Sequence, residues 1–187
     1  MNKRIKTLFL FLFLAFLSAE AQEAGKNRED DVLWRNKDVG FVIDIGDDIP
    51  VFGVETINGE FIDNDMFANQ VVIFQFLASW CPYGKEQMVA LSTAIQRRYP
   101  ESVSVICVSE DDEEGRVLFE EMAKESGLNF SFVVDDRERL FKSFASSHAT
   151  LPRVVIFGKR GKVIGLFDEH NRRMIRIMKR IVRYQMK

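Results

Sequence analysis

Three stretches of the chain are almost continuously apolar, at residues 71–77, 103–108 and 130–134. A short apolar run without polar alternation is typical of a strand that is covered on both faces of its sheet. Two further apolar runs, 153–157 and 162–167, are joined by the sequence GKRG, which predicts a tight hairpin. The pattern predicts a mixed sheet in which this last hairpin adds an antiparallel edge.

Helical spacing of apolar residues fills the gaps between these runs. A first helix is predicted between the turn at Cys81 and Pro100. A second begins in the acidic run DDEE, where the helix dipole favours negative charge, and ends at Gly127. A short helix follows around 140–144, and a final helix starts near Asn171. Strands that alternate with helices predict an α/β protein whose sheet is largely parallel and carries helices on both faces.

The segment before the first buried strand has a hairpin pattern of its own. Asn58-Gly59 separates the apolar stretch 52–57 from the stretch 60–62, and Asn-Gly is the strongest short signal for a hairpin turn. We therefore expect an N-terminal β-hairpin. The regular pattern starts at Gly46, so the sequence predicts one domain over 46–187, preceded by an extension over 22–45.

The chain opens with the features of a secretory leader. Three cations lie within the first six residues, an apolar run follows at 8–17, and Ala19-Glu20-Ala21 has the small-x-small pattern of a cleavage site. We predict a signal peptide at residues 1–21 and an exported protein, periplasmic or secreted. A retained membrane anchor is the alternative, although the apolar run is too short to span a bilayer.

The charge balance does not suggest a nucleic-acid binder, because 26 Lys and Arg face 28 Asp and Glu. The last helix, NRRMIRIMKRIVRYQMK, combines an apolar stripe with many cations. Such a helix can lie on anionic lipid. We favour a helix that packs on the sheet and keeps its cations in water, because the stripe has the width of a core-facing helix.

The two cysteines have different surroundings. Cys107 lies inside an apolar run and is expected to be a small buried side chain. Cys81 lies where a buried strand gives way to a helix, so unpaired N–H groups of the first helical turn surround it with positive potential. Cys81 is the candidate nucleophile, and the alternative is a purely structural cysteine. The cysteines and histidines show no metal-ligand spacing, and no cofactor is implied.

The ordered set of motifs resembles the thioredoxin superfamily, specifically its exported thiol–disulfide oxidoreductases of the TlpA/ResA and AhpC/TSA-like group. The sequence VVIFQFLASWCPYGKE resembles the active-site strand, turn and helix of that group, and TLP followed by RVVIFGKRGKVIG resembles its cis-proline loop and final hairpin. The resemblance implies a thioredoxin-like fold with Cys81 as the attacking cysteine and Pro152 as the cis-proline. It also places Gln75 where thioredoxins often have a buried acid.

One position departs from the pattern of this group. The second cysteine of the two-cysteine motif is replaced by Gly84. A second thiol normally releases the mixed disulfide formed by the first, so release here needs an outside thiol. The sequence predicts a monothiol oxidoreductase that reacts with protein or low-molecular-weight thiols and disulfides. One alternative is oxidation of Cys81 to sulfenic acid, followed by reduction by an external thiol. The other is a redox-inactive binding or scaffold protein. The residues expected to shape the site or dock substrate are Trp80, Pro82, Tyr83, Gly84, Leu151 and Pro152.

Overall fold

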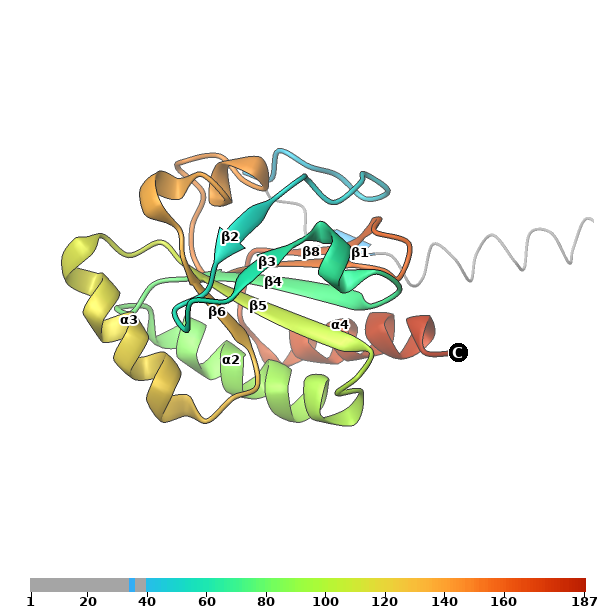
Figure 1. Cartoon of the computed structure of the whole chain (residues 1–187). Coiled ribbons are helices and arrows are strands. Elements are labelled where there is room, and N and C mark those ends of the chain that lie inside the picture. Colours follow the sequence, from blue (N-terminus) through green and yellow to red (C-terminus); the bar gives the residue numbers. More distant parts are fainter. Residues whose placement is uncertain (1–33, 36–39) are drawn as a thin grey trace, which may run out of the picture. The chain divides into compact units, whose positions relative to one another are not determined.

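The computed structural model describes residues 34–35 and 40–187, so the predicted leader and most of the predicted extension lie outside the described part of the chain. A six-stranded sheet in the order β1-β8-β7-β4-β5-β6 forms its centre (Figure 1). Strands β4, β5 and β6 are mutually parallel, whereas β7 runs antiparallel to both β4 and β8. The strands are β1 (Trp34–Arg35), β4 (Val71–Leu77), β5 (Val103–Ser109), β6 (Ser131–Val134), β7 (Arg153–Phe157) and β8 (Val163–Phe167).

Different kinds of element cover the two faces of the sheet. In Figure 1, α2 and α4 lie on one side of the sheet and the β2–β3 hairpin lies on the other. Helix α3 joins α2, because its Phe119 contacts Phe132 on the sheet face that α2 covers. Helical elements thus occur on both faces as predicted, but the three α-helices share one face and 3₁₀ helices accompany the hairpin. The helices are α2 (Pro82–Ala94), α3 (Glu113–Ser126) and α4 (Arg172–Gln185); the hairpin is β2 (Gly53–Glu55) and β3 (Phe61–Asp63); the 3₁₀ helices are η1 (Asn64–Phe67), η2 (Gln96–Arg98), η3 (Asp136–Glu138) and η4 (Phe141–Ser143).

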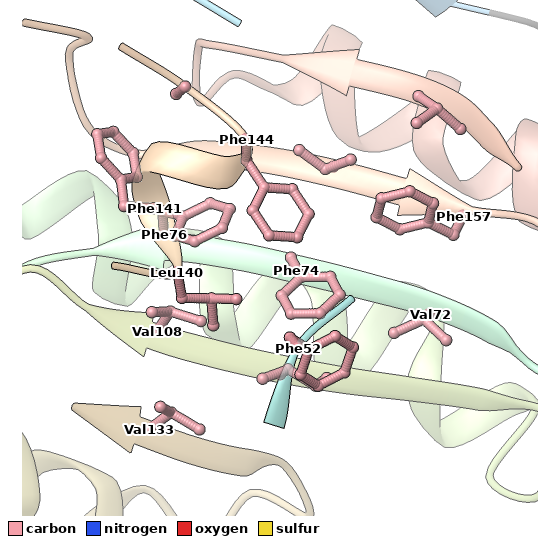
Figure 2. Close-up of a cluster of buried hydrophobic side chains, with 14 of the residues drawn as sticks. Phe52, Val72, Phe74, Phe76, Val108, Val133, Leu140, Phe141, Phe144 and Phe157 are labelled. Carbon is pink, nitrogen blue, oxygen red and sulfur yellow. The ribbon is translucent and has the colours of Figure 1, made fainter. Parts of the chain in front are cut away.

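Phenylalanines join the hairpin and η4 to the sheet (Figure 2). The ring of Phe74 in β4 lies 5.2 Å from that of Phe52, just before β2, and 4.8 Å from that of Phe144, just after η4. The ring of Phe76 lies 5.3 Å from that of Phe141. Aromatic side chains bury large apolar areas, so these contacts hold the hairpin and η4 against β4.

Two predictions were wrong, one about the end of the first helix and one about the edge of the sheet. Helix α2 ends at Ala94 rather than at Pro100, because Ile95 leaves helical conformation with φ of −128° and a 3₁₀ turn continues the chain. Ile95 stays fully buried, so the apolar spacing did not reveal the break. The last hairpin does not supply the edge strand either, because β1 pairs in parallel with β8. A two-residue strand is too short to leave a sequence pattern.

The C-terminal helix uses its apolar stripe for packing. Met174, Met178, Ile181 and Val182 of α4 are buried, while the six arginines and lysines between Arg172 and Arg183 are exposed. The stripe is therefore covered by the protein itself. Within residues 34–35 and 40–187, no helix has the length and apolar character needed to cross a bilayer.

Candidate functional site

The sheet and α2 place Cys81 at the junction that the sequence predicted. After β4 ends at Leu77, the backbone N–H of Cys81 donates to the carbonyl of Ala78 at 2.9 Å and closes a tight turn. Cys81 is the N-cap of α2 with extended backbone, and Pro82 begins the helix, where its missing N–H costs nothing. The thiol makes no capping hydrogen bond. Cys81 is only 4% exposed, which is less than a reactive cysteine usually shows.

The loop before β7 lies at the same edge of the sheet. The peptide bond between Leu151 and Pro152 is cis. Arg153, the first residue of β7, pairs with Phe76, so this register sets the Leu151–Pro152 loop beside the turn that leads from β4 to Cys81. Pro152 is buried and Leu151 is half-buried.

Two aromatic residues border the covered thiol in sequence and are exposed themselves. Trp80 is 73% exposed and Tyr83 is 60% exposed. Most of the Trp80 side chain is therefore in contact with solvent. An apolar surface next to a covered thiol suits a site that meets a larger molecule, because exposed aromatics favour contact with a partner.

Gly84, at the position of the missing cysteine, is packed against the sheet. A Cβ atom built on Gly84 would lie 2.8 Å from the Cβ of Leu77, closer than real Cβ contacts come. Leu77 is fully buried in β4, so its backbone-attached carbon has nowhere to go. A side chain at this position would therefore require α2 or β4 to shift. The glycine is part of the packing and not merely a lost cysteine.

A buried amide network lies beneath Gly84. The side-chain nitrogen of Gln75 donates to the Gly84 carbonyl at 2.9 Å and to the side-chain oxygen of Gln87 at 3.2 Å. The Cys107 thiol donates to the Gln75 side-chain oxygen at 3.4 Å. Gln75 is fully buried and its amide neither gives nor takes a proton at neutral pH. The network holds α2 onto β4 without supplying the proton acceptor that a second thiol would need.

Cys107 lies inside strand β5 and not at the turn that holds Cys81. It is completely buried in β5, and both cysteines are free thiols. Burial strongly raises the pKa of the Cys107 thiol. The sequence prediction of a small buried side chain is confirmed.

Asp111 anchors the turn before Cys81 and was missed at the sequence level. Its carboxylate accepts hydrogen bonds from the Ser79 N–H at 2.7 Å, the Ser79 hydroxyl at 2.8 Å and the Ser109 hydroxyl at 2.7 Å. The acidic run predicts a helix start, but only the residues after Asp111 have that role, with Asp112 capping α3. The pattern Ser-x-Asp was the available signal, because such side chains form local turns.

Replacing Asp111 with alanine is expected to lower the free energy of unfolding by about 3 kcal/mol, because three donors lose a charged acceptor. The reaction of the Cys81 thiol with a small disulfide should slow about tenfold, since Ser79 lies two residues away and a misplaced reacting group is costly. Urea denaturation and an exchange assay measure the two effects. The matched control is Asp112→Ala, which removes a helix cap and should cost only about 1 kcal/mol. Equal losses in both variants would contradict the anchoring role.

Two carboxyl groups lie close together after β5 and β6. Burial, together with the charge of Asp135, raises the pKa of Glu110 to about 9. Burial also raises the pKa of Asp135, and the N–H groups of Leu140 and Phe141, which donate to its carboxylate at 2.9 and 2.7 Å, oppose that rise. Glu110 is therefore protonated at neutral pH in the folded protein. Nothing in the acidic composition of this region marked it as different.

Replacing Glu110 with glutamine is expected to make the protein more stable at alkaline pH. Since the folded pKa of about 9 is above the unfolded value, Glu110 costs stability progressively as pH rises from about 4.5 to 9. After a discount for solvent screening, the variant should gain about 1–3 kcal/mol over wild type at pH 9 and little at pH 5. Urea denaturation at several pH values measures the difference. Parallel stability profiles for the two proteins would contradict this assignment.

A pocket of about 850 Å³ lies away from the cysteine, between the hairpin and the loop after β6. None of the predicted site residues lines it. Its lining consists of residues 51–59, Arg116, Val134, Asp135, Arg139, Leu140 and Ser143. No group of three or more His, Cys, Asp or Glu side chains suitable for a metal ion occurs within the described part of the chain.

Comparison with solved structures places this architecture among known folds. A candidate protein disulfide isomerase from Bacteroides thetaiotaomicron aligns with a TM-score of 0.67 and 22% identity, over 78% of this chain and 94% of that one. A candidate thiol:disulfide interchange protein DsbE from Chlorobium tepidum aligns with a TM-score of 0.65 and 18% identity, over 78% and 99% of the two chains. A secreted Mycobacterium tuberculosis disulfide oxidoreductase aligns with a TM-score of 0.53 and 17% identity, over 63% and 83%.

The chain has the fold of these thioredoxin-like structures, with a mixed central sheet and an N-terminal hairpin as the sequence predicted. Residues 45–165 match the model of the AhpC/TSA family, and the chain belongs to that family. No curated protein sequence matches the chain significantly.

Proposed function

We propose that the protein catalyses thiol–disulfide exchange through Cys81 alone. The observation that carries this proposal is the combination of a cysteine at the start of α2 with a Gly84 that has no room for a second thiol. Cys81 lies at the N-terminus of α2, where backbone N–H groups lack helical partners, and the neighbouring Leu151–Pro152 loop offers backbone to an extended substrate. The closed position at Gly84 makes release depend on a thiol from outside the chain.

The exchange takes two steps, and neither changes the net redox state. In the first, the Cys81 thiolate attacks one sulfur of a substrate disulfide, forms a mixed disulfide with that half and releases the other half as a thiolate. In the second, an external thiolate attacks the substrate sulfur of the mixed disulfide and regenerates the Cys81 thiolate. The products are a new disulfide and the free protein. The substrates are protein or low-molecular-weight disulfides and thiols.

The relatives support this chemistry in general terms. Solved structures of similar fold are described as a thiol:disulfide interchange protein and as a secreted disulfide oxidoreductase. The secreted relative also supports export, which we propose depends on a signal peptide at 1–21. The catalytic domain is then residues 46–187, with residues 22–45 as an extension. Trp80, Pro82 and Tyr83 border the nucleophile in this proposal.

A binding or scaffold role on the same fold is the second candidate. Its supporting observation is that Cys81 is covered while Trp80 and Tyr83 are exposed, as expected of a surface that holds a partner without reacting. The two functions differ in turnover. A scaffold shows no rate of exchange above the uncatalysed reaction, whereas an exchange catalyst completes many cycles for each protein chain.

A steady-state assay tests the proposal. A peptide joined to glutathione by a disulfide is mixed with excess reduced glutathione and a catalytic amount of the protein from residue 22 onward. Attack of Cys81 on the glutathione sulfur releases the peptide as a thiolate, and reduced glutathione then regenerates Cys81 and forms glutathione disulfide. The proposal predicts release of the peptide thiol at a rate proportional to protein concentration, with more than one turnover per chain. No rate above the reaction of peptide and glutathione alone would overturn the exchange function and favour the scaffold.

A further inference from the structure

Arg153 turns back over the loop that precedes it. It is the first residue of β7, directly after Pro152, and is only 2% exposed. Its Nε donates a hydrogen bond to the carbonyl of Thr150 at 2.9 Å. Charged side chains are rarely this buried unless they are held by specific contacts. The guanidinium therefore fixes the backbone on the far side of Leu151.

A segment far away in the sequence closes over this arginine. The guanidinium carbon of Arg153 lies 4.7 Å from the centre of the Phe41 ring, a cation–π contact. A Cβ atom on Gly40 would lie 3.1 Å from Arg153 Nη2 and 3.1 Å from the Ala149 Cβ. Gly40 has φ of +110°, a conformation that favours glycine. The backbone at Gly40 thus packs directly on the arginine and on Ala149. Ala149 directly precedes the Thr150–Pro152 loop, which we name the docking loop.

Residues 40–43, which we name the strap, are themselves fastened to the chain just before the docking loop. The Ser146 N–H donates to the Gly40 carbonyl at 2.7 Å, and the Val42 N–H donates to the Phe144 carbonyl at 2.9 Å. Phe41 also packs against the aromatic core beside β4. Because Phe144 belongs to that core (Figure 2), the strap has a rigid base. Arg153 lies between this base and the loop.

We propose that Arg153 is a positioning residue which, clamped by Phe41 of the strap, holds the Thr150–Pro152 loop in the conformation that docks an extended peptide beside Cys81. This role rests on the proposed exchange function. The loop offers its backbone at Leu151, and backbone pairing requires a fixed geometry. A small disulfide needs little of that docking surface, so the clamp matters for peptide substrates and not for the reactivity of the sulfur itself.

Three variants test the clamp. Arg153→Met keeps the apolar stem and removes the guanidinium, Arg153→Lys keeps the charge, and Phe41→Leu removes the ring. Hydrogen exchange at residues 148–151 is measured against β4 amides as an internal reference for global unfolding. Steady-state assays with reduced glutathione compare the peptide–glutathione disulfide with a small disulfide of a different thiol, bis(2-hydroxyethyl) disulfide. The matched control is Arg98→Met, since Arg98 also stacks on an aromatic ring, 5.8 Å from the centre of Tyr99, but at the opposite end of α2.

If the clamp holds the loop, Arg153→Met and Phe41→Leu should each raise the rate of amide hydrogen exchange at residues 148–151 about tenfold relative to the β4 amides. KM for the peptide disulfide should rise about fivefold with kcat within a factor of two, and bis(2-hydroxyethyl) disulfide should react as with wild type. Arg153→Lys should recover part of the loss, while Arg98→Met changes nothing. Unchanged hydrogen exchange at residues 148–151 overturns the clamp, even if the wild-type protein shows no thiol–disulfide exchange activity. A mobile loop with an unchanged KM overturns its docking role. An inactive wild type with a mobile loop in the variants overturns the exchange function alone.

Discussion

Replacing Cys81 with serine is expected to abolish catalysed exchange, lowering the rate by more than about a thousandfold, because a serine hydroxyl does not supply the nucleophile that a thiolate does. Fold and stability should change little, since the two side chains are close in size and the Cys81 thiol makes no capping hydrogen bond. The peptide–glutathione assay measures the rate, and thermal unfolding checks the fold.

Cys107→Ala is the matched control for this experiment. Cys107 is completely buried, and burial raises its thiol pKa, so its removal should leave the exchange rate intact. It should still lower stability by about 1 kcal/mol, because the side chain packs in β5 and donates to Gln75. A Cys81→Ser protein that keeps its activity, or a Cys107→Ala protein that loses it, would contradict the assignment of Cys81 as the reactive cysteine.

Placing a side chain on Gly84 is expected to destabilise the protein. Alanine at an open helical position gains about 1 kcal/mol over glycine. Here the new Cβ would lie 2.8 Å from the Leu77 Cβ, so Gly84→Ala should instead cost about 1–3 kcal/mol through overpacking. Gly84→Cys, which restores the two-cysteine motif, should cost at least as much and should not gain an efficient dithiol cycle. Urea denaturation and titration of free thiols after oxidation measure both effects.

Ala90→Cys provides the control, since Ala90 lies on the same helix at a partly exposed position. It should be nearly neutral for stability and equally unable to pair with Cys81. A stabilised Gly84→Ala protein would show that α2 has room at this position. A Gly84→Cys protein that readily forms an intramolecular disulfide would show that only the second thiol was missing, and the reading of Gly84 as a packing residue would fail.

The parts of the fold that the sequence predicted are those written in local patterns. The run at 71–77 became β4 with its predicted bounds, and Asn58-Gly59 lies at the turn of the hairpin. Cys81 and Gly127 mark helix ends as expected. In each case one short stretch carries the whole signal, in its hydrophobic pattern, turn chemistry or capping.

The parts that the sequence did not predict depend on contacts between distant segments. Asp111 lies in an acidic run that is typical of a helix start. It anchors the turn before Cys81 only because Ser79, after the end of β4, comes close enough to donate to its carboxylate. The closeness of Gly84 to Leu77 is a matter of tenths of an ångström in helix–sheet packing. In the sequence, Arg153 looks like an ordinary cation in a strand, and only the structure shows that the Phe41 ring packs on its guanidinium. Residue identity alone carries none of these distances.

The most direct test of the account is the intact mass of the Cys107→Ala protein after mixing with the peptide–glutathione disulfide and then with excess reduced glutathione. We predict a single adduct on Cys81 in the first stage, confirmed by peptide mapping, and its complete loss in the second. Absence of the adduct, or an adduct that the external thiol does not release, would contradict single-cysteine exchange as the function of this site.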